Sequence, residues 1–95
     1  MSISSYADEL LFLASHLAPW EVSEKQFLAL VAMLSDGTPL ARADREEIRR
    51  FLATAKASAA LVDPRVLDAS SIWRASVEAA KGRKESVYID LTEEM

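Results

Sequence analysis

The side chains suited to acid–base chemistry in this 95-residue chain do not form a catalytic pattern. His16 is the single histidine, its neighbours Leu13, Leu17 and Pro19 are apolar, and cysteine is absent. A histidine that acts as a general base needs a nucleophile or an orienting carboxylate within hydrogen-bonding reach. We therefore expect His16 to lie at the edge of the core or on the surface, and we predict that the protein is not an enzyme.

Neighbouring carboxylates could in principle serve as paired acids or metal ligands. They occur at Asp8–Glu9, Glu46–Glu47 and Glu93–Glu94. Adjacent helical side chains point about 100° apart, so such pairs do not converge on one bond or one ion. Asp8 and Glu9 instead suit the N-terminus of a helix, where the helix dipole favours negative charge. No metal, cofactor or catalytic residue is expected.

The composition is that of one small folded domain. Hydrophobic residues make up 51% and charged residues 27%, with only two Gly and three Pro. No apolar stretch approaches the roughly 20 residues of a membrane helix, and Asp8 and Glu9 precede the first apolar run, which argues against a secretory signal. We expect a soluble cytoplasmic protein with no membrane partner.

Capping patterns predict the first two helices. Ser5 followed by Asp8, and Ser23 followed by Gln26, have the spacing of capping boxes. The first helix should end before Pro19, and the second should span about residues 24–35 and occupy the centre of the fold. Gly37 suits the left-handed position after a helix end.

Two further helices are predicted beyond Gly37. The third starts at Pro39 or at Asp44, carries an apolar stripe from Ile48 to Ala59, and ends before Pro64. The fourth is capped by Ser70 or Ser71 and ends at Gly82. The predicted fold is an all-α bundle of about four helices joined by short antiparallel connections, with residues 1–84 as the helical domain and residues 85–95 as an extended acidic tail.

Charge is segregated along the chain. Residues 1–41 hold five acids and one base, residues 42–84 hold ten bases and six acids, and residues 85–95 hold four acids. Basic residues of the third helix could contact phosphates: Arg42, Arg45, Arg49 and Arg50. Nucleic-acid binding is the alternative function, but interleaved acids, including a Glu46–Arg50 pair at i,i+4 spacing, and the acidic tail make a nucleic acid an unlikely partner.

Large apolar side chains in the first third of the chain suggest an interaction surface. Leu11 and Phe12 lie outside the main apolar stripe of the first helix, so its apolar face is wider than one contact needs. Trp20 follows Pro19 in a loop, and either the core or an interface could hold it. We predict Leu11, Phe12 and Trp20 as hydrophobic anchors for a partner protein.

The end of the chain has the alternation of a β-strand. Val87, Ile89 and Leu91 would share one apolar face, with acidic residues beside it at Asp90, Glu93 and Glu94. A single strand cannot satisfy its own backbone hydrogen bonds. The tail is therefore predicted to pair with a partner protein or with a second copy of the chain, which leaves a homodimer open.

The same residues resemble a SUMO-interacting motif, a short apolar core with an acidic flank. The residues that carry the resemblance are Val87, Ile89, Asp90, Leu91, Thr92, Glu93 and Glu94. The resemblance covers only these positions and implies addition of a strand to a ubiquitin-like partner. Strand addition to some protein partner is the broader prediction.

Together these features predict a non-enzymatic protein-binding regulator. An inhibitor, an antitoxin-like or immunity-like protein and a small chaperone all act by occupying the surface of another protein. The anchors Leu11, Phe12 and Trp20 and the tail would make the contact. The identity of the partner is left open.

Overall fold

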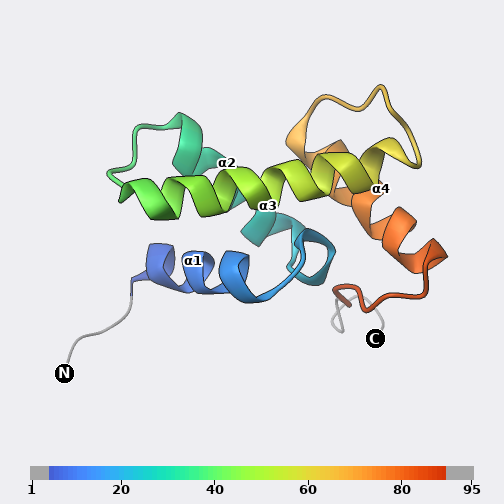
Figure 1. Ribbon diagram of the computed structural model, residues 1–95, viewed down its shortest axis with the longest axis horizontal. Coiled ribbons are helices and arrows are strands. Elements are labelled where there is room, and N and C mark those ends of the chain that lie inside the picture. The colour runs from blue at the N-terminus through green and yellow to red at the C-terminus, as the bar shows by residue number, and fades with distance from the viewer. Residues whose placement is uncertain (1–4, 90–95) are drawn as a thin grey trace.

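The computed structural model describes residues 5–89, and all regular structure within them is helical. The elements in chain order are α1 (Tyr6–His16), the 3₁₀ turn η1 (Pro19–Glu21), α2 (Glu24–Ser35), α3 (Arg42–Ala60) and α4 (Ala69–Gly82). The predicted all-α bundle of four helices is confirmed. Figure 1 shows α3 across the molecule, with α1 on one side of it and α4 crossing its C-terminal half.

The capping boxes predicted at the first two helices are present. The Ser5 hydroxyl accepts a hydrogen bond from the Asp8 backbone N–H at 3.1 Å, and Asp8 accepts one from the Ser5 N–H at 3.4 Å. At α2, Ser23 and Gln26 make the same reciprocal bonds at 3.0 and 2.9 Å. Each box satisfies backbone donors that the first turn of a helix leaves unpaired.

The predicted starts of the third and fourth helices are wrong. α3 begins at Arg42, after an extended Ala41 that offers no side-chain cap, so Asp44 lies in its first turn. α4 is capped by Asp68, which accepts a hydrogen bond from the Ser71 N–H at 3.0 Å. That bond from the backbone of Ser71 lowers the pKa of the Asp68 carboxyl from its ordinary value. Aspartate caps as well as serine does, so the sequence offered several equivalent starts.

The core lies where α3 meets the other helices. α3 packs against α1, η1, α2 and α4, and so occupies the central place that was predicted for α2. Leu10, Phe27, Leu30 and Ile48 are at most 2% exposed and come from α1, α2 and α3. α3 and α4 pack against each other through small buried side chains. At this contact the Ser58 hydroxyl donates to the backbone oxygen of Ser76 at 3.4 Å.

The C-terminus of α4 is closed by a Schellman motif. The Glu85 N–H donates to the Ala80 oxygen at 2.9 Å, and the Lys84 N–H donates to the Lys81 oxygen at 3.0 Å. Lys84 has a φ of 62°, in the left-handed region where this motif usually has glycine. Gly82 is the last helical residue, so the glycine lies two residues before the position that needs it.

Exchanging Lys84 for glycine should therefore stabilise the protein. We expect Lys84→Gly to raise the free energy of unfolding by up to about 1 kcal/mol, because a side chain in the left-handed region is strained and glycine is not. Gly37 has a φ of 79°, so Gly37→Ala is the opposite control and should lose about 1 kcal/mol. Urea titration measures both, and a destabilised Lys84→Gly variant would contradict this assignment of the turn.

Candidate functional site

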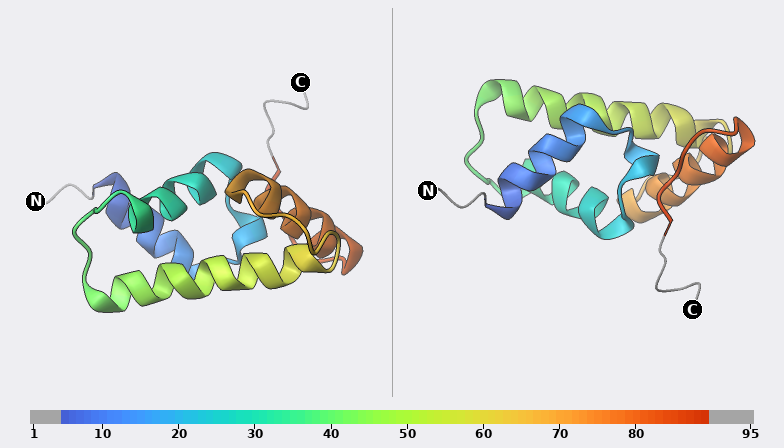
Figure 2. Two further views of the ribbon diagram at one scale, coloured as in Figure 1. Left: turned by 90° about the horizontal axis from the view of Figure 1, so that it is seen from above. Right: turned by 90° about the horizontal axis from the view of Figure 1, so that it is seen from below.

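The segment after α4, residues 83–89, folds back over η1 and is called the strap below. Its Tyr88 N–H donates to the backbone oxygen of Trp20 at 2.7 Å. The half-buried Val87 packs against a small apolar cluster of Trp20, Val77 and Ala80. Figure 2 shows the chain returning from the end of α4 toward η1. The strap thus closes one end of the bundle.

Arg83 fastens the start of the strap. Its guanidinium lies 5.0 Å from the centre of the Trp20 ring, and its Nη2 donates to the Ser58 hydroxyl at 3.4 Å. It also pairs with Glu85. A cation held over an indole face is attracted by the ring quadrupole, typically by about 0.5–1 kcal/mol at a partly exposed site.

Trp20 belongs to the core. Its side chain is 8% exposed and is covered by Arg83 and Val87. The sequence left the choice between core and interface open, and the expectation of an exposed anchor at this position is not met. Burial of this kind is common for a tryptophan that closes the end of a bundle.

The structure places only part of the predicted tail site. Val87 is half-buried against Trp20, and Ile89 is 60% exposed. Residues 83–89 form no strand. Asp90, Leu91, Glu93 and Glu94 lie outside the described residues, so strand addition, and with it a ubiquitin-like partner, stays a prediction.

Phe12 lies on the side of α1 that faces away from the core. Leu10 and Ala14 are 2% and 7% exposed and mark the buried side of the helix. Phe12 is two residues from each of them, about 200° around the helix, so its side chain points to solvent. It is 61% exposed, and its ring stacks on His16 with 4.1 Å between ring centres.

Hydrogen bonding within α1 occupies His16. Its Nδ1 lies 2.9 Å from the Phe12 backbone oxygen and 3.0 Å from the Ser15 hydroxyl. The predicted surface position is observed, since His16 is exposed. Its contacts are those of a residue that fixes the Phe12 ring.

A shallow pocket of about 480 Å³ opens beside Phe12 between α1 and α2. Its lining residues are Asp8, Glu9, Phe12, Leu13 and Gln26. We call the exposed α1 side chains at this pocket, Asp8, Glu9 and Phe12, the Phe12 face. Leu11, the other predicted anchor on this helix, is half-buried and packs against the main core. Leu11 therefore belongs to the core, whereas Phe12 is exposed.

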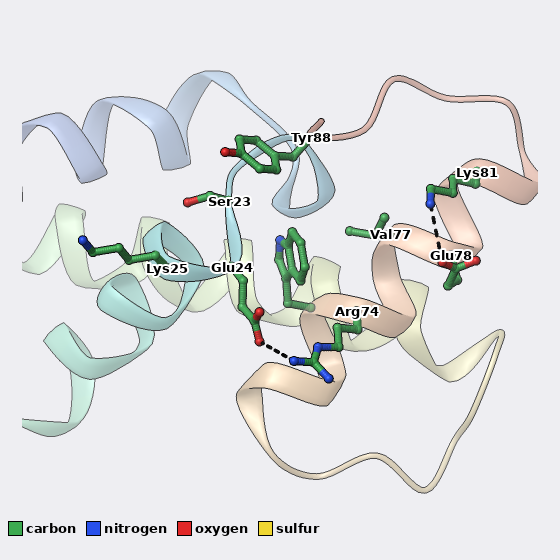
Figure 3. A pocket seen from close by; sticks show the side chains of 9 residues that line it. Ser23, Glu24, Lys25, Arg74, Val77, Glu78, Lys81 and Tyr88 are labelled. Atoms are coloured by element: carbon green, nitrogen blue, oxygen red, sulfur yellow. Dashed lines mark ion pairs between the residues drawn. The ribbon is translucent and has the colours of Figure 1, made fainter. Parts of the chain in front are cut away.

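A second groove, of about 610 Å³, lies between the start of α2 and α4 (Figure 3). Tyr88 and Ser23 stand on one side of it and the Glu24–Arg74 pair on the other. That pair is separated by 3.5 Å, and a Glu78–Lys81 pair by 3.6 Å. The two pairs neutralise their own charges, and Lys25 adds one further positive charge to the lining.

Sequence reasoning missed this groove because its walls meet only in the folded chain. Trp73, which also lines it, is held in place by a hydrogen bond from Nε1 to the Val22 oxygen at 2.9 Å. These partners are far apart in the sequence. No local pattern joins them.

The predicted basic stripe lies along α3. Arg49 pairs with Glu46 at 2.9 Å and Arg50 with Glu47 at 2.7 Å. The predicted pairing of Glu46 with Arg50 is wrong, because each glutamate bonds the arginine three residues on. Two of the four arginines proposed for phosphate contact, which also include Arg42 and Arg45, are thus engaged within their own helix.

Other classes of site find little support in the described part of the chain. Residues 5–89 contain no cluster of three or more side chains suited to a metal ion. None of the helices described is both long and apolar enough to cross a bilayer. Comparison of the chain with protein-family models, curated proteins and solved structures found no match. Function has to be argued from these surfaces alone.

Proposed function

We propose that this protein is a non-enzymatic regulator that acts by occupying the surface of a partner protein. Inhibitors, antitoxin-like and immunity-like proteins and small chaperones work in this way. The observation that carries the proposal is Phe12, a large aromatic side chain held 61% exposed beside an open pocket. Aromatic residues are enriched in the buried centres of protein interfaces and often dominate their binding energy.

Contacts of the ring support this role. Phe12 stacks on His16, and His16 Nδ1 hydrogen-bonds the Phe12 backbone oxygen, so the ring has a neighbour that limits its rotation. A side chain that is already ordered loses less conformational entropy when a partner covers it. These contacts favour a role for Phe12 in binding a partner rather than in packing within the bundle.

The strap supplies a second contact region on the side of α3 that also carries α1 (Figures 1 and 2). Tyr88 and Ile89 are 36% and 60% exposed there. The sequence that follows Ile89 holds the predicted tail residues. A partner that covers this side of α3 would contact both α1 and the strap.

Exchange of Phe12 for serine tests the proposal. We expect a partner captured from a lysate of the source organism by the wild-type protein to bind Phe12→Ser at least about 30-fold more weakly, as loss of an interface hot spot would give. The circular dichroism should not change, because Phe12 makes little contact with the core. The control is Leu67→Ser, which alters a side chain that is 90% exposed in the α3–α4 loop. Equal capture by the Phe12→Ser variant would refute a role for this face.

A further inference from the structure

We infer that the Phe12 face recognises a basic segment of a partner protein, with an apolar side chain packed on Phe12 and a lysine or arginine beside Glu9. The inference rests on the proposed function and adds the chemistry of the partner. It depends on which charges surround the exposed ring. The same charges distinguish this face from the other exposed apolar surfaces.

The pocket beside Phe12 carries acids and no base. Asp8 and Glu9 both line it. Asp8 also accepts the capping bond from Ser5. Glu9 is exposed, and within residues 5–89 its carboxylate takes part in no ion pair. Glu9 would therefore not have to give up an ion pair within residues 5–89 in order to bind a cation of the partner.

The distribution of charge along the chain acts in the same direction. Lys25 is the one base in residues 1–41, and it lines the separate groove between α2 and α4. The ten other lysines and arginines lie in residues 42–84, and two of them, Arg83 and Lys84, belong to the strap. A partner that approaches α1 meets the exposed acids Asp8 and Glu9, and this helix carries no lysine or arginine. Complementary charge raises association rates and selects among partners.

An exposed apolar region in the loop between α3 and α4 lacks this asymmetry. Leu61, Val62 and Leu67 are 73%, 53% and 90% exposed in the loop between α3 and α4. Arg65 in this loop is paired with Asp63 at 3.7 Å. Because these two charges neutralise each other, the loop does not select a partner by charge. Of these two regions, only the Phe12 face combines an exposed apolar ring with unbalanced acidic charge, which suits a basic segment that carries an apolar side chain.

Two synthetic amphipathic helical peptides provide the test. Both have a leucine face, and the polar face is lysine in one and glutamate in the other. Fluorescence anisotropy with the full chain should show the lysine peptide binding at least about tenfold more tightly than the glutamate peptide, and binding of the lysine peptide should weaken as salt is raised. Phe12→Ser and Glu9→Lys should each weaken it by about tenfold.

Glu78→Lys is the matched control, because it changes the net charge as Glu9→Lys does but lies on α4. Glu78→Lys should weaken binding of the lysine peptide much less than Glu9→Lys does. Equal weakening by the two reversals would show attraction to the overall charge and would overturn the inference, as would failure of the lysine peptide to bind. If both peptides bind equally and Phe12→Ser weakens both, the basic partner is refuted while protein binding at Phe12 stands. Binding that ignores Phe12→Ser would refute both.

Discussion

Replacement of Trp20 by alanine is expected to lower the free energy of unfolding by about 3–5 kcal/mol, the usual loss for a large buried aromatic side chain. Trp20 is 8% exposed and forms the centre of the cluster that includes Val77 and Ala80. Its removal also takes away the ring beneath Arg83. A domain of this size typically has only about 5–10 kcal/mol of stability, so the variant should be close to unfolding at room temperature.

Urea titration followed by circular dichroism measures this loss. Trp20→Phe should lose clearly less, because it keeps most of the apolar area. Leu67→Ala is the exposed control and should change stability by no more than about 0.5 kcal/mol. A loss below about 1 kcal/mol for Trp20→Ala would contradict burial under the strap. It would favour Trp20 as an exposed partner anchor, the other reading that the sequence allowed.

Removal of residues 87–95 should abolish partner capture while leaving the four helices in place. The helices lie within residues 6–82, and among the described residues of the removed segment, 87–89, Val87 is the one that packs into an apolar cluster. The helical circular dichroism should therefore change little. The chain has two tryptophans, so the emission of Trp20 is measured in a Trp73→Phe background. There it should shift to longer wavelength, because the deletion removes Val87 from above the indole and lets water reach it.

Two full-length variants separate the contributions of the tail to binding. Val87→Ala weakens the packing of the strap against the Trp20 cluster. Exchange of Asp90, Glu93 and Glu94 for their amides removes the negative charge alone. The amide variant should slow association with a basic partner and keep the Trp20 emission of the wild type. Unchanged capture by the truncated protein would show that the tail has no part in binding.

Local patterns predicted the helices well where one residue type had one suitable position. Ser5 and Ser23 each stand three residues before a side chain that can return the capping bond, and both helices start there. Gly37 takes the left-handed conformation that its place after α2 suggested. Prediction failed at Asp68, where several neighbouring residues could have capped the helix and the packing of the helices decided. The end of α4 at Gly82 was predicted correctly, but no local pattern pointed to the left-handed Lys84 that follows it.

The candidate site was less accessible from the sequence because its parts meet only after folding. Burial of Trp20 depends on Arg83 and Val87, more than sixty positions later. Phe12 could be named from its place outside the apolar stripe of α1, but Leu11 shared that property and turned out to pack against the core. Which side of a wide apolar helix is covered is decided by the other helices.

We expect the Phe12 face to be covered by another protein in the cell. The most direct test of this expectation is site-specific photocrosslinking in the source organism, with a benzophenone amino acid placed at position 12 and, as a control, at position 67. We predict one main crosslinked protein from position 12, attached through a segment rich in lysine or arginine and absent from the position 67 control. No crosslink from position 12, or the same products from both positions, would contradict the account.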